Sequence, residues 1–285
     1  MALLGAHTSI AGGISLAIER GDQMKCEAIQ IFVQSSRTWK IPSLEEEERT
    51  RFREALAGAK HVKSVVAHNS YLLNLSTTDR DLRKKSVAYF VETMERCESL
   101  GIEGLITHPG SHLGAGVEAG IKETSDSLNE VLKACRGFKS KIILENTAGQ
   151  GGCIGHEFEH LRDIVQGTGE PERIAFCFDT QHAFAAGYDL RTREGYQNTM
   201  KKFDDLLSLK QLIAFHLNDS LKEFNCHVDR HQNIGKGFLG KEVFRELVND
   251  ARFENVPMCI ETDPGEDDAL HKQDLKLLRS LRKKN

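Results

Sequence analysis

Eight short apolar runs alternate with charged, helix-periodic stretches along this chain, and the alternation predicts a (β/α)8, or TIM, barrel. Six of the run ends follow one another at intervals of about 40 residues. A βα unit needs about 30 residues, so each run can be followed by its own helix. No Pro-, Gly- or Ser-rich linker interrupts the pattern, and we therefore expect one domain over residues 1–285.

The predicted strands are the apolar runs themselves. In chain order they cover residues 3–7, 28–33, 64–68, 104–108, 141–145, 174–179, 212–216 and 258–261.

The predicted helices occupy the stretches between the runs. Residues 43–61 begin with Ser43 and have Glu46 three positions on, which predicts a capping box. Residues 77–101 end on Gly101, a typical helix terminator. Further helices are expected near residues 116–136, 156–166, 192–208, 240–250 and 267–282.

Nine side chains that can bind a metal ion lie at or near the predicted strand ends. They are His68, His108, Glu145, Asp179, His182, His216, Asp229, His231 and Glu261. The carboxyl ends of barrel strands converge on one face, where active sites are built, so these residues are expected to be neighbours. Asp229 and His231 lie in a long segment after the run at 212–216, and long ordered loops are usually functional. Imidazole and carboxylate together are the ligands of catalytic zinc, and the set predicts a polynuclear centre.

Composition leaves the partner open. The formal net charge is −4, but three divalent ions would add six positive charges, so nucleic acid is not excluded. The seven cysteines are scattered without a CxxC pair, which favours reduced thiols in a cytosolic or nuclear compartment. No stretch approaches the length of a membrane span, and no membrane contact is expected.

The chain resembles the endonuclease IV family of apurinic/apyrimidinic (AP) endonucleases over essentially its whole length. The resemblance rests on long, ordered motifs: GAHTSIAGG (5–13), RTW (37–39), HNSYLLNL (68–75), HPGSH (108–112), ENTAGQG (145–151), FDTQHAFAAGYDLRT (178–192), HLNDS (216–220), VDRH (228–231) and IET (260–262).

The resemblance implies a TIM barrel with three zinc ions. The implied ligands are His68, His108 and Glu145 for the first ion, Glu145, Asp179, His216 and Glu261 for the second, and His182, Asp229 and His231 for the third. The ligand types leave manganese open at one of the sites.

Such a centre supports hydrolysis of a phosphodiester, with a metal-bridging hydroxide as the nucleophile. Glu145 and Glu261 are the expected catalytic carboxylates; Glu145 would position the nucleophile. The resemblance implies cleavage 5′ to an abasic site, giving a 3′-hydroxyl and a 5′-deoxyribose phosphate, with removal of blocking groups from 3′ ends as a second activity.

The partner implied is double-stranded DNA that contains abasic sites or blocked 3′ ends. By resemblance, Arg37, Tyr71 and Leu72 would insert into the DNA while the abasic nucleotide is flipped into the site. A single complete barrel needs no second copy, so we expect a monomer in the cytoplasm, associated with the nucleoid in a prokaryote.

Two positions depart from the family pattern. Gln181 stands where DTCH is common, and its side chain should point away from the metals. Asn69 stands where an acidic residue is common, and the loss of charge is expected to loosen the orientation of His68. Two other classes of function stay open: a divalent-metal sugar isomerase on the same barrel, and a DNA-damage-binding protein without catalysis.

Overall fold

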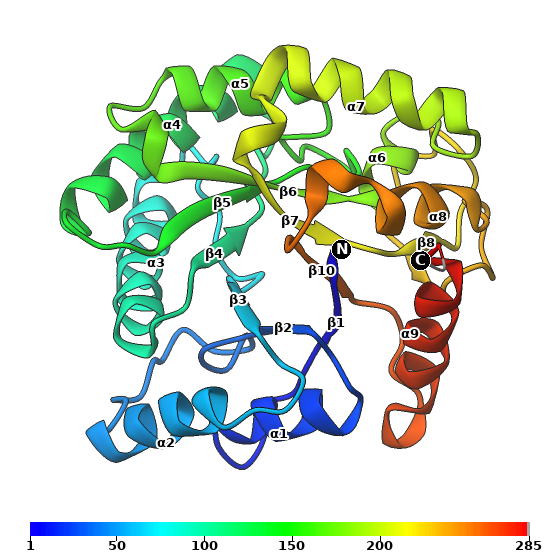
Figure 1. The fold of residues 1–285 in the computed structure, drawn as a ribbon. Helices are drawn as coiled ribbons and strands as arrows, with labels where there is room; N and C mark the ends of the chain where they lie inside the picture. The colour runs from blue at the N-terminus through cyan, green and yellow to red at the C-terminus, as the bar shows by residue number, and fades with distance from the viewer. Residues whose placement is uncertain (284–285) are drawn as a thin grey trace.

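The computed structural model describes residues 1–283, and it contains a closed barrel of eight parallel strands in the order β1-β10-β7-β6-β5-β4-β3-β2. Helices surround the strands on the outside (Figure 1). The strands are β1 (Leu3–His7), β2 (Ala28–Ile31), β3 (Ser64–His68), β4 (Gly104–Thr107), β5 (Lys141–Glu145), β6 (Ile174–Asp179), β7 (Leu212–His216) and β10 (Pro257–Ile260). The predicted TIM barrel and its eight strands are confirmed.

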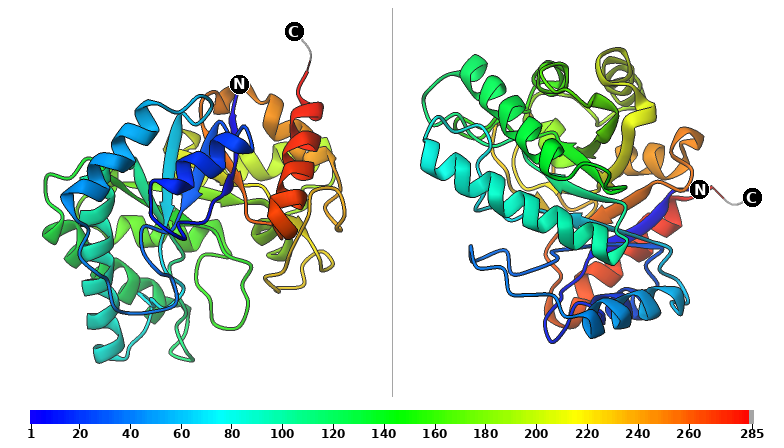
Figure 2. Two further views of the ribbon diagram at one scale, coloured as in Figure 1. Left: turned by 90° about the horizontal axis from the view of Figure 1, so that it is seen from below. Right: turned by 90° about the vertical axis from the view of Figure 1, so that its left-hand side faces the viewer.

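The barrel closes between its first and last strands. Leu3 pairs with Pro257 and Ala6 with Ile260, both in parallel register. Arg282, just after the last helix, donates to the carbonyl of Ala2 at 2.6 Å, so the end of α9 and the start of β1 lie at the same end of the barrel (Figure 2). The interior is filled by a small group of buried side chains: Val66, Ile106, Ile143, Ala175, Cys177 and Ala214. The barrel is therefore a packed core and not an open pore.

Eight helices follow strands along the outside: α1 (Leu16–Gln23), α2 (Glu46–Ala57), α3 (Arg80–Leu100), α4 (Val117–Ala134), α5 (Phe158–Gln166), α7 (Arg193–Leu207), α8 (Glu242–Asn249) and α9 (Ala269–Leu281). A further short helix, α6 (Thr180–Ala185), starts directly after β6. Short 3-10 turns cover Pro171–Arg173, Leu209–Gln211, Ala251–Phe253 and Glu266–Asp268. Within residues 1–283, no helix is long and apolar enough to cross a membrane.

Of the two helix boundaries predicted from capping residues, one is confirmed and the other is wrong. Gly101 ends α3 with a left-handed conformation (φ 73°), as expected. The capping box at Ser43 was wrong, because α2 begins only at Glu46 after an extended Glu45. The Ser43 hydroxyl instead donates to the Glu45 carboxylate at 2.6 Å, so it is not available to cap the helix.

The long segment after β7 is not structureless. Two short strands, β8 (Asp219–Ser220) and β9 (His231–Gln232), pair in antiparallel fashion inside it. The buried Asp219 carboxylate also accepts hydrogen bonds from the backbone of Gly237 and Leu239 at 3.0 and 2.9 Å. This pairing folds the segment back on itself and returns His231 to the rim.

Candidate metal centre

The nine predicted ligands gather at the carboxyl-terminal rim of the barrel. Six of them are the last residue of a strand or the residue directly after it: His68, His108, Glu145, Asp179, His216 and Glu261. His182 lies on α6, and Asp229 and His231 lie on the segment between β8 and the end of β9. The structure thus brings together all nine.

Glu145 occupies the middle of the cluster and is fully buried. Its Oε2 atom lies 3.1 Å from His68 Nε2 and 3.2 Å from His108 Nε2. Its Oε1 atom lies 2.8 Å from His216 Nδ1 and 3.2 Å from His182 Nδ1. Burial alone would raise the pKa of this carboxyl, but the imidazoles of His216 and His108 outweigh burial and hold the pKa well below its ordinary value.

The second group surrounds His216. Its Nδ1 atom lies 3.2 Å from Glu261 Oε2 and 3.7 Å from Asp179 Oδ2. Its Nε2 atom lies 2.6 Å from Gln30 Oε1, an oxygen that can only accept, so Nε2 carries the proton and Nδ1 is left facing the carboxylates. Burial alone would also raise the pKa of the Glu261 carboxyl, but the imidazole of His216 outweighs burial and lowers this pKa to about 2.

The third group consists of His182, Asp229 and His231 at the outer edge of the cluster. Asp229 Oδ2 lies 3.4 Å from His182 Nε2, and Oδ1 lies 3.5 Å from His231 Nε2; both distances exceed those of ordinary hydrogen bonds. Both Nε2 atoms are buried and have no hydrogen-bond partner among the described residues. Asp179 also faces this group, since its ligand atom and those of His182 and His231 lie within 4.8 Å of one another.

These contacts suit metal ions. Buried charged groups need partners of opposite charge, and this cluster places four carboxylates among five imidazoles. Leaving a buried polar nitrogen unpaired costs about 1–3 kcal/mol, and a cation between Asp229, His182 and His231 would remove that cost at two atoms at once. The donor set therefore fits divalent ions that bind nitrogen and oxygen.

Buried amide side chains orient the carboxylates, and the sequence reasoning missed all of them. Gln30 donates to Glu261 Oε1 at 2.6 Å. Asn218 donates to Asp179 Oδ2 at 2.7 Å. The side-chain oxygen of Asn146 accepts a hydrogen bond from the backbone N–H of Asp179 at 2.8 Å. A sequence signal did exist, because Gln30 interrupts an apolar run and Asn146 directly follows Glu145.

The two departures from the family pattern have different outcomes. Gln181 points away from the cluster, as expected, and donates to the carbonyl of Val228 at 2.9 Å. The expected loosening of His68 by Asn69 is not supported, because His68 Nδ1 is held by the main-chain carbonyl of Asn69 at 2.7 Å, a contact that does not depend on the side chain. His68 therefore keeps Nε2 directed at Glu145.

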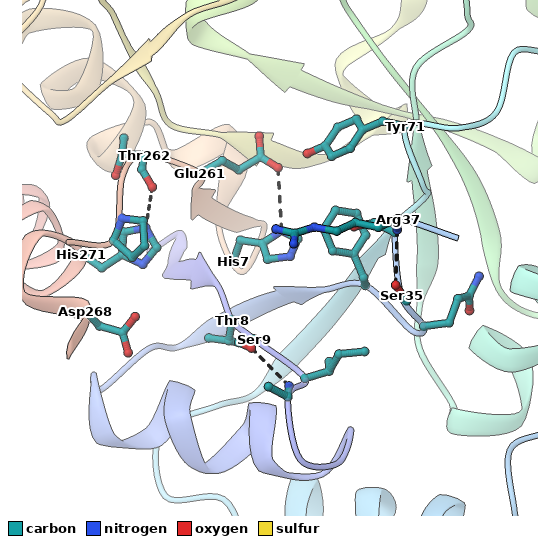
Figure 3. A pocket seen from close by; sticks show the side chains of 16 residues that line it. His7, Thr8, Ser9, Ser35, Arg37, Tyr71, Glu261, Thr262, Asp268 and His271 are labelled. Atoms are coloured by element: carbon teal, nitrogen blue, oxygen red, sulfur yellow. Dashed lines mark hydrogen bonds and ion pairs between the residues drawn. The ribbon is translucent and has the colours of Figure 1, made fainter. Parts of the chain in front are cut away.

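A cleft of about 680 Å³ opens beside the cluster, between the β1, β2 and β10 loops. Arg37, Tyr71 and Glu261 all line it, and Figure 3 shows Arg37 and Tyr71 on the side of the cleft opposite His271. Tyr71 is 67% exposed, and its ring lies 5.7 Å from the ring of His68. Leu72 lines a neighbouring hollow together with His108 and Asp229. The three residues predicted to contact DNA thus border the metal cluster on its open side.

A second histidine cluster lies outside this centre. His156, Glu157 and His160 offer ligand atoms within 4.8 Å of one another and spell H-E-x-x-H, a motif of zinc proteases. In that motif both histidines lie on one face of a helix, whereas here α5 begins only at Phe158 and His156 precedes it. The arrangement is therefore not the protease site.

The comparison with known proteins first gives the class. A family model described as a xylose isomerase-like TIM barrel matches residues 18–281. The chain belongs to this class, in keeping with its closed barrel and its ligands at the strand ends.

Individual relatives then give the family. The chain is 48% identical over 278 residues to a probable endonuclease 4 of Geobacter sulfurreducens, covering 98% of this chain and 94% of that one. It is 46% identical over 281 residues to a probable endonuclease 4 of Citrifermentans bemidjiense, covering 99% of each. The crystal structure of endonuclease IV from Thermus thermophilus is 31% identical, covers 98% of each chain and superposes with a TM-score of 0.86. The chain belongs to the endonuclease IV family, which confirms the predicted family and the predicted enzyme class, a hydrolase of the endonuclease type.

Proposed function

We propose that this protein is a DNA-repair AP endonuclease that hydrolyses the phosphodiester 5′ to an abasic site. The products would be a 3′-hydroxyl and a 5′-deoxyribose phosphate. Removal of blocking groups from damaged 3′ ends would be a second activity of the same centre, because both reactions hydrolyse a phosphate ester at a 3′ oxygen.

The observation that carries this proposal is the two-sided contact of Glu145. One oxygen faces His68 and His108, and the other faces His216 and His182. A carboxylate that offers its two oxygens to two separate groups of imidazoles has the arrangement of a bridging ligand between two metal ions.

Zinc ions bound here would supply a nucleophilic water at neutral pH and would neutralise the leaving oxygen. His68, His108 and Glu145 would hold the first ion, and Asp179, His216 and Glu261 would complete the second with Glu145. His182, Asp229 and His231 would hold the third. Glu145 and Glu261 are the proposed catalytic carboxylates, since both would bind these ions and Glu261 also lines the open cleft. Manganese in place of zinc at one site is compatible with the same ligands.

The rim residues would select the substrate. Arg37 is exposed and reaches the cleft, where it would contact phosphate, while Tyr71 and Leu72 would wedge into the base stack. Flipping a nucleotide costs least where the base is already missing, so this arrangement favours abasic DNA over intact duplex.

The test is incision of an end-labelled duplex with one abasic analogue, with zinc counted on the same preparation. We expect cleavage 5′ to the analogue by wild type and none by Glu261→Ala, although both are folded. Equal cutting by the two proteins would contradict the proposed centre.

The same preparation separates the two alternatives. A sugar isomerase would interconvert free aldose and ketose sugars and leave the duplex intact. A binding protein without catalysis would shift the abasic duplex in a gel without forming product.

We also propose that residues 1–285 act as one domain and as a monomer, in the cytoplasm with the DNA. The mass in solution, measured by light scattering with and without the abasic duplex, tests the monomer.

A further inference from the structure

One peptide unit in the long segment after β7 is held at both of its polar ends by glutamine side chains. Gln181 Nε2 donates to the carbonyl oxygen of Val228 at 2.9 Å. Gln150 Oε1 accepts from the backbone N–H of Asp229, also at 2.9 Å. These two backbone groups belong to the same peptide bond, so the pair of amides fixes the orientation of its plane. The Asp229 side chain is attached to the Cα atom that directly follows this peptide bond, so the orientation of the plane also sets the position of the side chain.

Gln181 reaches this peptide from the metal cluster itself. It lies on α6 directly after Thr180 and directly before His182, and it is fully buried. His182 and Asp179 face the other ligands, whereas Gln181 faces the neighbouring loop. The short helix therefore presents one ligand, His182, beside Asp179 at the end of β6, and on another side it presents a clamp for a third ligand.

Asp229 needs such a clamp more than the other ligands do. Its side chain is 43% exposed, and no barrel strand carries it, whereas Glu145, Asp179 and His216 are fully buried at strand ends. Fixing the backbone of one residue costs about 1–2 kcal/mol of conformational free energy. In a loop that buries little surface, specific hydrogen bonds must offset this cost.

The surroundings of the Gln181 side chain do not favour a role that consists only of filling space. Its Oε1 atom is buried and has no hydrogen-bond partner among residues 1–283. An unsatisfied buried oxygen is unfavourable, so a methionine of similar length would fill the same space at lower cost. Within residues 1–283, the Gln181 side chain makes one hydrogen bond, to Val228, and a methionine cannot reproduce it.

We propose that Gln181 and Gln150 are positioning residues that hold Asp229 at the place where it can bind an ion together with His182 and His231. The inference rests on the proposed metal centre and adds to it the reason why its most exposed ligand is ordered. It assigns Gln181 to the third ion alone, because its contact is with the Asp229 loop and not with Glu145, His68 or His216.

The test counts bound zinc by native mass spectrometry while a chelating buffer sets the free zinc concentration. Loss of a residue that orients a metal ligand typically costs about 10- to 100-fold in metal affinity. We expect Gln181→Met to weaken the third zinc by about this factor and to leave the first two unchanged. In steady state, kcat for abasic DNA should fall while KM stays near the wild-type value.

Two further variants keep the result interpretable. Gln150→Ala removes an exposed side chain from the other end of the same peptide and should weaken the third zinc in the same direction, even where Gln181→Met does not fold. Ser140→Ala is the matched control, because the buried Ser140 hydroxyl also donates to a carbonyl, that of Ile102 at 2.7 Å, at the far end of the barrel. It should lower the thermal midpoint without releasing zinc.

The outcomes separate the two levels of the proposal. Wild type that binds no third zinc, or does not cut abasic DNA, contradicts the proposed function itself. Wild type that binds three ions, with both glutamine variants binding the third ion equally tightly, overturns only the positioning role. Loss of all three ions together in a folded Gln181→Met also overturns it, because that would be a general loosening of the rim.

Discussion

His216 and Asp229 are both candidate ligands, but the protein places them by opposite means. His216 ends a barrel strand, is fully buried, and has both ring nitrogens in contact with Gln30 or with carboxylates. Asp229 lies on a loop, is 43% exposed, and reaches two imidazoles only at 3.4 and 3.5 Å. The inner half of the centre, around Glu145 and His216, is thus fixed by the barrel itself. The outer half, around Asp229, is fixed by side-chain hydrogen bonds from Gln181 and Gln150 to a loop.

This contrast suggests that the two halves have different roles. A buried, strand-borne half keeps its geometry whatever the substrate does, because changes there disturb the packed core. A loop-borne half next to open solvent can admit a bulky polymer and adjust to it, since loops are less tightly packed. If the two halves are independent, substitutions in each should have different effects.

The largest effect is expected for Glu145→Gln in the inner half. The amide keeps the size of the side chain but cannot offer two anionic oxygens, so both inner ions should bind weakly. Metal-ion catalysis supplies several kcal/mol, and about 4 kcal/mol corresponds to a thousandfold, so we expect incision to fall by about that factor or more. Single-turnover incision at saturating zinc measures it; a loss below tenfold would mean that Glu145 does not bridge.

Asp229→Ala should have a smaller effect, confined to the outer half. We expect one zinc per chain to be lost and incision to fall by about a hundredfold, or about 2.7 kcal/mol, since the inner pair is retained. Zinc analysis and kcat on the same sample check this. Simultaneous loss of two or three ions would show that the halves are not separable.

The pH dependence of the metal-free protein should reveal His182, which contacts both halves. Burial disfavours its charged form, but Asp179, Asp229 and Glu145 outweigh burial and raise its pKa well above 6.5. A raised pKa in the folded state stabilises the fold below pH 6.5, and this stability is lost as pH rises through the folded pKa.

Urea unfolding of zinc-stripped protein between pH 6 and pH 9 should therefore show a falling midpoint. Bound zinc would replace the proton, so the zinc-loaded protein should lack this fall. The same fall is expected from His216, whose pKa its neighbours Cys177 and Glu145 raise well above 6.5 despite burial. A metal-free midpoint that is constant, or that rises with pH, would contradict the assignment of protons to these two histidines.

The smallest effect is expected for Tyr71→Ala, outside both halves. Stacking of an aromatic side chain on a base is worth about 1–3 kcal/mol, so the preference for abasic over intact duplex should fall by about tenfold or somewhat more. The zinc count and the thermal midpoint should stay unchanged, because Tyr71 is 67% exposed. An unchanged preference, measured by competition binding, would remove Tyr71 from recognition.

The inner half was the easier part to predict from sequence. His68, Glu145, Asp179 and His216 each end an apolar run, and a polar residue that closes a buried strand is visible in the sequence as a break in hydrophobicity. The barrel then brings these breaks to one rim. The regular repeat of strand and helix made the fold predictable for the same reason.

The outer half and the supporting contacts were harder. The helix α6 has only six residues and β9 only two, too few for a periodic pattern. The clamp on the Val228–Asp229 peptide joins Gln150 and Gln181 to a loop far along the chain, and no local pattern indicates such a contact. The capping box predicted at Ser43 was wrong because the Ser43 hydroxyl donates to the nearby Glu45 carboxylate. The sequence alone does not show which of the two partners, the helix backbone or Glu45, the hydroxyl faces.

The shared carboxylate of Glu145 also has a consequence for how the centre fills. Once one ion holds one of its oxygens, the other oxygen is already oriented for a neighbour, so the second ion binds a site whose ordering cost has been met. We therefore expect the inner pair to fill cooperatively, with a sigmoidal zinc isotherm. In a cell short of zinc, such molecules would divide into empty and doubly loaded populations, and few would carry a single, inactive ion.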